Sequence, residues 1–384
     1  MFRFKPFLLT KYIHNYLWIL IKNLWVYIVL IELLKSLGLD KKLEKYDFKE
    51  EISDTGNSSA IKAIDKESSE FVFIKFLLFP RHITEINKFK NEIYITKKQG
   101  LYPVLSCFPR YIEGGELIEN YVYYFITEWI DGKTLKEKIY DLKDSNIREK
   151  LCLFYQVVRA LTALLGVEHR DLHPNNIFII EEKFSEFNRV GFYNNRISPG
   201  IKIIDFGEAV YPMSTQFDDS PDFLYDSYFQ TGRKIIAAFN YIAPEFYLPI
   251  LDGKYVRRLN ENSDIWSLGI ILYLILFNEN LFTYADIGTY LQSMNNGEMQ
   301  QNILEKSKKI LELDHPSKYI IYKLFNGIMS VNYKERPDLG DIQIIFWHVI
   351  NKEIVYSQSE TMQLIERPIK FLTEKGEISE PDYD

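Results

Sequence analysis

One short polar stretch, placed between apolar runs, constrains this chain more than any other feature. In "VEHRDLHPNNIFII", residues 167–180, Asp171 and Asn176 stand with a histidine and an arginine among residues of the kind that fill protein cores. A turn between two strands needs no such set. A second aspartate, Asp205 in "IKIIDFGEAV", follows another apolar strand and precedes a glycine. We therefore expect Asp171, Asn176 and Asp205 to converge at one polar end of the fold.

These three side chains suit metal binding and proton transfer. Mg²⁺ takes a few carboxylate or amide oxygens from a protein and leaves its other positions to phosphate and water. An aspartate near that metal can orient a hydroxyl group and accept its proton. The first stretch alone would also fit a capped turn, so the prediction of a site depends on the second aspartate, Asp205.

Composition limits the class of protein. The chain has 384 residues, 47% of them hydrophobic, so it can bury one large core or two lobes. Its net charge of −7 leaves no basic excess to neutralise the phosphates of a nucleic acid, and we expect no nucleic-acid partner. Cys107 and Cys152 have neither disulfide nor metal-ligand spacing, which indicates a reduced, cytoplasmic compartment.

The order of elements along the chain predicts an α+β fold. Residues 69–79 and 121–130 are rich in aromatic and β-branched side chains, which is typical of strands. Residues 84–100 carry apolar side chains at helical spacing, and 135–166 is largely helical. The polar tail, 355–384, is expected to be loosely ordered. A strand-rich part up to about residue 130 is thus followed by a helix-rich part, which suggests two lobes.

The N-terminal segment, 1–45, is predicted to be a helical extension. Its apolar stretch, 16–38, is interrupted by Lys22 and Glu32, and the longest charge-free run within it, 23–31, is too short to span a bilayer. Residues 10–36 form a helix with one narrow polar face when placed at helical spacing. Such a helix can dock on the protein's own core or on a partner, or it can lie at a membrane surface. A secretory signal is disfavoured because a lysine breaks the apolar region.

Together the motifs resemble the eukaryotic-type protein kinase family, over residues 46–350. Lys75 in "FVFIK" matches the lysine that grips the ATP phosphates, and Glu92 in "KNEIYITKK" matches its helix partner. The resemblance implies a bilobal protein kinase-like fold, with a strand-rich N-lobe at about 46–130 and a helical C-lobe at about 131–350. It leaves 351–384 as a C-terminal tail.

The resemblance also assigns roles around the first polar stretch. Asp171 matches the catalytic base, and Asn176 and Asp205 match the two Mg²⁺ ligands. It implies that His169 packs beneath the loop against Phe206. Arg170 would hold a negative charge from the activation segment. Further motifs support the C-lobe: Asp264 would brace the catalytic loop, and Arg336 in "KERPD" would pair with Glu245 of the A-P-E element.

Two stretches are predicted to bind the nucleotide. The best alignment of the glycine-rich loop is "DTGNSSAI", 54–61, where one glycine of the usual three survives. The hinge is "FITEWIDGKTL", 125–135, with a small threonine at the back of the ATP pocket and backbone groups for adenine. The predicted nucleotide contacts besides Lys75 are Asp54, Gly56, Ser59, Ile61, Thr127, Glu128, Trp129 and Ile130.

The chain departs from the family pattern at the acceptor side. His173 stands where Ser/Thr kinases place a lysine, and Ala238 replaces the threonine that this lysine contacts. We count His173 among the catalytic residues, since a protonated imidazole could donate to phosphate, and the rate would then fall as the pH rises. No tyrosine-kinase arginine pattern follows Asp171, so Ser and Thr are the expected acceptors, including autophosphorylation between residues 211 and 234.

Three functions remain open on these grounds. The first is a Ser/Thr protein kinase that uses ATP and Mg²⁺ on a protein substrate. The second is a small-molecule kinase of the aminoglycoside or choline type, which "DLHPNN" favours and the A-P-E element disfavours. The third is a pseudokinase that acts as a binding module, which the poor glycine-rich loop favours. For the first, contact with a membrane surface through residues 10–36 is a further possibility.

Overall fold

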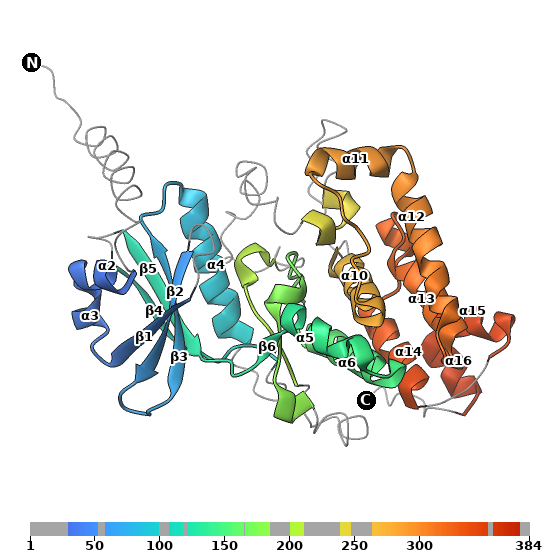
Figure 1. Ribbon diagram of the computed structural model, residues 1–384, viewed down its shortest axis with the longest axis horizontal. Coiled ribbons are helices and arrows are strands. Elements are labelled where there is room, and N and C mark those ends of the chain that lie inside the picture. The colour runs from blue at the N-terminus through green and yellow to red at the C-terminus, as the bar shows by residue number, and fades with distance from the viewer. Residues whose placement is uncertain are drawn as a thin grey trace, which may run out of the picture. The chain divides into compact units, whose positions relative to one another are not determined.

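The structure is a computed structural model, and it divides the chain into two compact units. The first comprises Met1–Ile93 and Arg110–Trp129, and the second comprises Tyr94–Pro109 and Ile130–Asp384 (Figure 1). Each is described by itself. The residues that the structure describes are 30–52, 58–99, 107–117, 121–164, 166–184, 200–210, 239–246, 263–351 and 356–376.

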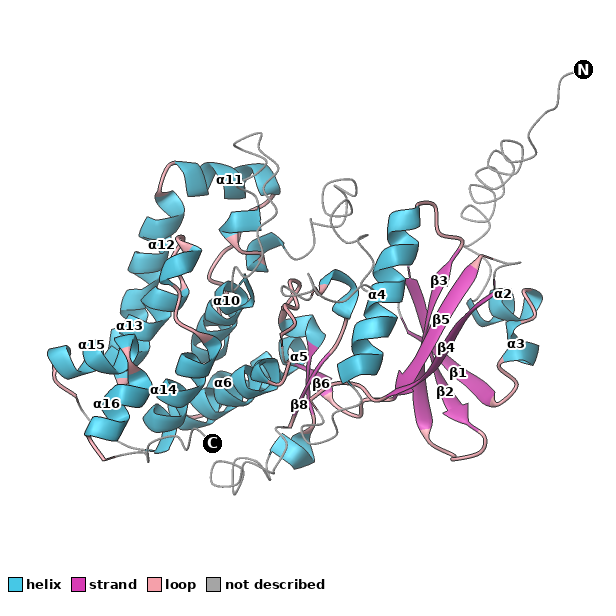
Figure 2. Ribbon diagram, turned by 180° about the vertical axis from the view of Figure 1, so that it is seen from behind, coloured by secondary structure: helices cyan, strands magenta, loops and turns pink. Residues whose placement is uncertain are grey.

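The first unit is built on a five-stranded antiparallel sheet of order β1-β2-β3-β5-β4 (Figure 2). Aromatic and β-branched side chains dominate the strands Phe71–Leu78 and Val122–Glu128, and helix α4, Ile83–Gln99, follows the first of them. The predicted strands at 69–79 and 121–130 and the predicted helix at 84–100 are therefore confirmed. The strands are β1 Tyr46–Ile52, β2 Ser58–Asp65, β3 Phe71–Leu78, β4 Tyr111–Leu117 and β5 Val122–Glu128.

The two faces of this sheet pack on different helices (Figure 2). On one face Phe125 and Leu77 contact Phe89 of α4. On the other, Ile74 and its neighbours pack on two short helices, α2 Leu30–Ser36 and α3 Leu39–Lys42. Gly38 separates these helices with a left-handed φ of 72°, a conformation that glycine adopts without strain.

The N-terminal extension is thus docked, in its described part, on its own sheet. Leu34 and Leu39 are fully buried in the same apolar cluster as the strands. For residues 30–43 this confirms docking among the predicted alternatives. The rest of the predicted helix, residues 10–29, lies outside the described residues. No helix in the described part of the chain is long and apolar enough to cross a membrane.

The second unit is helical and surrounds one long apolar core. Its central helix, α10 Ser263–Phe277, is buried on all sides from Ser263 to Leu276, because apolar residues occupy its whole circumference. A small sheet of β6 Lys133–Thr134, β7 Ile177–Ile179 and β8 Ile201–Ile203 lies beside α5 and α6 (Figure 1). The other α-helices up to residue 351 are α5 Leu135–Asp141, α6 Ile147–Thr162, α11 Ile287–Asn295, α12 Glu298–Ser307, α13 Lys318–Ile328 and α14 Leu339–Asn351.

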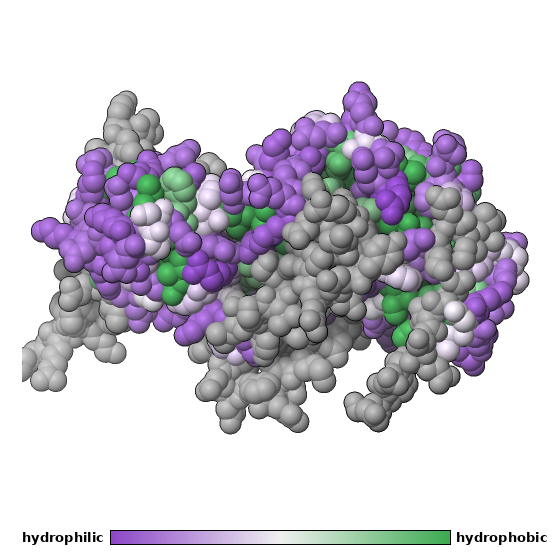
Figure 3. All heavy atoms as spheres, turned by 90° about the horizontal axis from the view of Figure 1, so that it is seen from below, coloured by the Kyte–Doolittle hydropathy of each residue, from purple (hydrophilic) through white to green (hydrophobic). Residues whose placement is uncertain are grey.

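Short 3₁₀ turns join these elements at the points where the chain changes direction. They are η2 Leu142–Asp144, η3 Pro174–Asn176, η5 Phe206–Glu208, η8 Phe239–Tyr241, η9 Pro244–Phe246, η10 Lys308–Glu312 and η11 Tyr333–Glu335. On the face seen in Figure 3, hydrophilic residues make up most of the surface of the described part, as the burial of the apolar side chains requires.

The C-terminal tail is folded, contrary to the prediction. Helices α15 Gln358–Glu366 and α16 Pro368–Glu374 bury Leu364, Phe371 and Leu372 in the core of the second unit. Ser357 caps α15 in a capping box with Glu360. The expectation of a loose tail is therefore wrong for residues 356–376, which pack on the helical unit beyond residue 350. A few apolar side chains at helical spacing suffice to dock these helices, although their overall composition is polar.

Candidate functional site

The small sheet brings two of the predicted site residues to one place. Strands β7 and β8 are antiparallel, with Ile177 opposite Ile203, so the start of β7 lies beside the end of β8. Asn176 immediately precedes β7, and Asp205 follows β8 by two residues. The Ile204 N–H donates to the Asn176 carbonyl oxygen at 3.0 Å, which ties the two segments together. The predicted convergence of Asn176 and Asp205 follows from this pairing.

Asp171 is held against the same sheet edge by two neighbours. The Asn176 side-chain Nδ2 donates to the Asp171 carbonyl oxygen at 2.9 Å. The Asp171 N–H donates to His169 Nδ1 at 3.3 Å, and His169 Nε2 lies 2.9 Å from the Ile204 carbonyl oxygen. Because Nδ1 accepts, Nε2 carries the proton and donates. The buried ring also packs on Phe206 with 5.3 Å between ring centroids, which confirms the predicted structural role of His169.

The backbone of the catalytic loop is braced by one buried carboxylate. Asp264 accepts hydrogen bonds from the His169 N–H at 2.7 Å and from the Arg170 N–H at 2.8 Å. Arg170 has a φ of 64°, in the left-handed region that a residue with a β-carbon rarely adopts. The two hydrogen bonds hold it there. The predicted bracing by Asp264 is confirmed.

The donor set at this edge fits Mg²⁺. Asn176 uses its amide nitrogen on Asp171, so its amide oxygen points elsewhere, as a metal ligand requires. Asp205 supplies a carboxylate from a residue held at a φ of 65°. Within the described ranges, no group of three or more His, Cys, Asp and Glu side chains could hold a metal ion. A pair of oxygen ligands, with the remaining positions left to phosphate and water, is the pattern typical of Mg²⁺ rather than of a closed protein cage.

His173 differs from its prediction. Its Nδ1 accepts a hydrogen bond from the Asn175 N–H at 3.3 Å, and its Nε2 lies 3.8 Å from Asp171 Oδ2. Burial lowers the pKa of the imidazole from 6.5 to about 4. His173 is therefore neutral near pH 7 in this structure, which argues against the expectation that a protonated His173 assists the reaction. The sequence does not reveal this burial, part of which comes from Tyr241, whose ring centroid lies 6.2 Å away.

In the first unit, Lys75 and Glu92 form the predicted ion pair. The Lys75 Nζ lies 2.7 Å and 2.9 Å from the two carboxylate oxygens of Glu92. Lys75 comes from β3 and Glu92 from α4, which packs on that face of the sheet through Phe89 and Phe125. The side chains keep 14% and 7% of their surface exposed. The Lys75–Glu92 ion pair therefore joins β3 to α4.

The predicted glycine-rich loop is misaligned by one residue. Asp54 and Gly56 lie outside the described residues. In the sheet, Ala60 is directly opposite Lys75, so Ala60 shares the face of the lysine. Ser59 and Ile61 are on the opposite face, and Ile61 is fully buried against α2 and α3. The assignment of the Ile61 side chain to the nucleotide is therefore wrong, because a shift of one residue turns every side chain of a strand to the other face. A phosphate contact through the backbone of Ser59 stays a prediction.

Some backbone groups of the predicted hinge form hydrogen bonds within the sheet unit. Thr127 is buried and pairs with Phe73, on the same face as Lys75, and its hydroxyl donates to the Glu128 carbonyl oxygen at 3.2 Å. The N–H groups of Glu128 and Trp129 donate to backbone carbonyls of Arg110 and Phe71, at 3.0 Å and 3.2 Å. The N–H groups of these two residues are therefore engaged within the sheet unit, and backbone contacts of Glu128 and Trp129 to adenine would have to come from their carbonyl oxygens. A donor from Ile130 stays a prediction.

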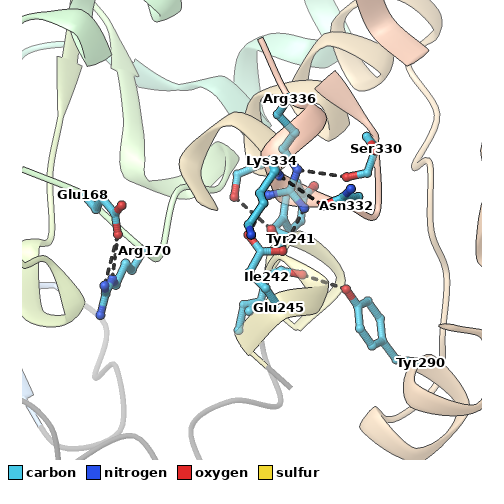
Figure 4. Close-up of polar contacts among 11 residues, drawn as sticks. Glu168, Arg170, Tyr241, Ile242, Glu245, Tyr290, Ser330, Asn332, Lys334 and Arg336 are labelled. Carbon is cyan, nitrogen blue, oxygen red and sulfur yellow. Dashed lines mark hydrogen bonds and ion pairs between the residues drawn. The ribbon is translucent and has the colours of Figure 1, made fainter. Parts of the chain in front are cut away.

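The A-P-E element is anchored by a fully buried ion pair (Figure 4). Arg336 donates through Nη1 and Nη2 to the two oxygens of Glu245 at 2.6 Å and 2.8 Å, and both side chains are 0% exposed. Its Nε donates to the Ser330 carbonyl oxygen at 3.0 Å, and the guanidinium lies 5.2 Å from the Trp266 ring centroid. The predicted pairing of Arg336 with Glu245 is confirmed.

Sequence reasoning missed the residues that hold the segment before A-P-E. The buried Tyr290 hydroxyl of α11 donates to the Ile242 carbonyl oxygen at 2.8 Å (Figure 4). Ser267 of α10 donates to the Tyr241 carbonyl oxygen at 2.9 Å. No local signal marks Tyr290 among the 27 tyrosines of the chain, because its partner is 48 residues away in the sequence.

Comparison with known proteins agrees with this geometry. The family model described as the protein kinase domain matches residues 46–350. The chain belongs to the protein kinase family. The sheet unit and the helical unit of this kinase-family chain are accordingly the N-lobe and the C-lobe of the bilobal kinase fold.

Curated relatives are similar over most of this chain. Calcium-dependent protein kinase 5 of Plasmodium berghei is 26% identical over 349 residues, which cover 88% of this chain and 52% of the relative. Serine/threonine-protein kinase PSK1 of Saccharomyces cerevisiae is 24% identical, over 82% of this chain and 20% of the relative. Probable serine/threonine-protein kinase fhkD of Dictyostelium discoideum is 26% identical, over 74% and 34%. The chain spans about half or less of the length of these relatives.

Proposed function

We propose that this chain transfers the γ-phosphoryl group of ATP to serine and threonine hydroxyls of protein substrates. The observation that carries the proposal is the edge of the small sheet, where Asp171, Asn176 and Asp205 are tied together through His169 and Ile204. Phosphoryl transfer depends mainly on positioned charges, and this edge positions a base beside two oxygen ligands.

Each residue of this edge has a proposed role. Asp171 accepts the proton of the attacking hydroxyl and orients it toward the phosphorus atom. Asn176 and Asp205 would hold Mg²⁺, which neutralises phosphate charge when it is bound. In the N-lobe, Lys75 positions the α- and β-phosphates, and Glu92 fixes the direction of the lysine ammonium.

Ser and Thr are the proposed acceptors. Similar curated relatives, among them PSK1 and fhkD, carry the name serine/threonine-protein kinase. The loop "HRDLHPNN" contains no arginine after Asp171 of the kind that tyrosine kinases use. His173 replaces the usual lysine. We propose that neutral His173, with Nδ1 engaged by the Asn175 N–H, presents its Nε2–H toward Asp171 and the incoming phosphate.

The proposal ranks above the two alternatives for structural reasons. The segment 239–246 is anchored by Arg336, Tyr290 and Ser267, and such an anchored segment suits a protein substrate better than a small metabolite. A binding module without catalysis has no need of the closed Lys75–Glu92 pair or of the strained Asp205.

The test is a transfer assay with radiolabelled ATP and Mg²⁺, with generic protein substrates, aminoglycosides and choline in parallel. Phosphosites on the substrate and on the chain are then mapped by mass spectrometry. We expect phosphoserine and phosphothreonine on protein. Mainly phosphotyrosine would reject the acceptor, labelled small molecules would favour the metabolite kinase, and no transfer to any acceptor would favour the binding module.

A further inference from the structure

Arg170, the residue before the proposed base, has a partner that family resemblance does not predict. Its guanidinium donates through Nε and Nη2 to Glu168 Oε2, at 3.1 Å in both cases (Figure 4). The two side chains are only 9% and 11% exposed. The expected partner of this arginine was a negative charge on the activation segment. In the described residues a carboxylate two positions away already fills that role.

Three contacts fix Arg170, and the described part of the chain supplies all of them. Asp264 accepts its backbone N–H at 2.8 Å and so holds the left-handed φ of 64°. Glu168 binds one edge of the guanidinium, and the Phe246 ring lies 5.4 Å from its central carbon, within range of a cation–π interaction. Arg170, which precedes Asp171, is thus held through its backbone N–H, one edge of its guanidinium and the face of its guanidinium.

Glu168 is itself firmly placed. Its N–H donates to the Val210 carbonyl oxygen, and the Val210 N–H donates back, both at 2.9 Å. This bridge joins the chain before the catalytic loop to the chain after Phe206. The backbone of Glu168 is therefore fixed by its hydrogen bonds with Val210. This fixed backbone places the Glu168 carboxylate beside Arg170.

We propose that Glu168 is the resident counter-ion of Arg170 and a positioning residue for Asp171, in place of a phosphorylated side chain. Turnover then needs no prior phosphorylation of the chain. The inference rests on the proposed function, because it concerns regulation of the same site. The physical reason is charge balance: a guanidinium that already shares a partly dehydrated ion pair attracts a phosphate much less than an unpaired one does.

The first test compares turnover before and after phosphatase treatment. We expect wild-type turnover to change by less than about twofold. For Glu168→Gln, which keeps the shape and removes the charge, we expect kcat after phosphatase treatment to fall about tenfold with the KM for ATP unchanged. Glu168→Asp keeps the charge and should retain most of the activity. The exposed Glu182, changed to Gln, is the matched control and should have no effect.

A second test does not depend on catalysis. The melting temperature is measured with increasing inorganic phosphate against sodium chloride at the same ionic strength. Phosphate should stabilise Glu168→Gln, whose Arg170 has lost its counter-ion, but neither the wild type nor the double variant Glu168→Gln/Arg170→Gln. This result would support the resident counter-ion even if no phosphoryl transfer were detected, in which case only the proposed function fails.

Three results would overturn the inference. The first is loss of wild-type turnover on phosphatase treatment, with activity regained in Glu168→Gln, because Glu168 would then act as a latch that phosphate must displace. The second is a phosphatase-treated Glu168→Gln variant as active as the wild type. The third is equal stabilisation of the wild type and Glu168→Gln by phosphate.

Discussion

Two ion pairs join distant parts of this sequence, one in each lobe, and they are built differently. The N-lobe pair, Lys75 with Glu92, keeps 14% and 7% of its side-chain surface exposed. The C-lobe pair, Arg336 with Glu245, is 0% exposed on both sides, and its arginine also contacts Ser330 and Trp266. A lysine ammonium that keeps some contact with solvent can exchange a partner for a phosphate, whereas a guanidinium engaged on both edges and one face cannot.

This difference in burial suggests that the Lys75–Glu92 pair serves the reaction and that the Arg336–Glu245 pair stabilises the fold. Removing a partner from a closed, buried pair leaves an uncompensated charge, and the cost falls on folding. Removing a partner from a pair that contacts substrate costs turnover first, and the cost to folding is smaller where one partner keeps some contact with solvent. The following predictions test whether the two pairs divide in this way.

Between the two pairs, the largest effect is expected at Lys75, on turnover. In Lys75→Met the proposed phosphate contact is lost, and we expect kcat/KM to fall at least about 10²-fold. The melting temperature should fall less than in Arg336→Met, because a methionine of similar length fills the same space and the Lys75–Glu92 pair is less completely buried. Steady-state kinetics and thermal unfolding of the same preparation check both points. The exposed Lys41, changed to Met, is the control. A large loss of stability in Lys75→Met would remove the distinction between the pairs.

Arg336 should show the opposite pattern. We expect Arg336→Met to lower the free energy of unfolding by about 3–5 kcal/mol, because it leaves the Glu245 carboxylate buried and unpaired. The double variant Arg336→Met/Glu245→Leu should regain part of this loss, since it removes both charges. Urea unfolding measures all three proteins. A single variant as stable as the wild type would contradict the architectural role of the pair.

His173 should have a smaller effect on the pH dependence. The pKa of His173 in the folded protein is about 4, against 6.5 for the free imidazole, so the side chain is neutral from about pH 6 to 8. Wild type and His173→Gln should therefore have parallel pH–rate profiles in this range. A wild-type rate that falls with rising pH near 6.5, and is flat in His173→Gln, would restore the protonated role.

The lowered pKa of His173 also makes the stability of the protein depend on pH. A histidine whose folded pKa is depressed binds more protons in the unfolded state between pH 6.5 and 4. Its contribution to stability is therefore present above pH 6.5 and is lost as the pH falls toward 4. Unfolding of wild type and His173→Gln across this range should show a steeper acid loss in the wild type. Equal slopes would contradict the burial of the imidazole.

The smallest effect is expected at an exposed pair of the C-terminal helices. Glu360 accepts from Lys375 and Ser357, which lower its pKa from 4.5 to about 2. The stabilisation is present above pH 4.5 and lost as the pH falls through 2. We expect Glu360→Gln to shift the melting temperature only slightly at pH 7, because solvent screens the charges. A large shift of the melting temperature would contradict the expectation that solvent screening makes the Glu360–Lys375 pair a minor contributor to stability.

Much of the site could be predicted because its residues occur in compact motifs. Lys75, Glu92, Asp264 and Arg336 each stand at a fixed place in a short pattern, and the structure finds their partners where the motifs indicate. Asn176 and Asp205 could be placed together because each lies close to the end of a short apolar strand, and Asp171 because it stands in the same short motif as Asn176. Local pattern was enough wherever a residue's role depends on its own strand, helix or turn.

The rest depended on contacts that local pattern does not contain. A single glycine was not enough to align the glycine-rich loop with the family pattern. An alignment error of one residue then assigned Ile61 to the wrong face of the sheet. The neutrality of His173 depends on burial by a distant segment. The pair of Glu168 with Arg170 depends on the left-handed backbone of Arg170, which the distant Asp264 holds. The folded tail escaped notice because so few of its side chains are apolar.

The most direct test of the account is phosphoryl transfer by Asp171→Asn. The substitution preserves the shape of the side chain, and its backbone contacts with Asn176 and His169 remain. We predict that turnover falls about 10²–10⁴-fold while the melting temperature stays near that of the wild type. The exposed Asp144, changed to Asn, should leave turnover unchanged. Transfer at the native rate by a folded Asp171→Asn would contradict the assignment of the base and with it the proposed mechanism.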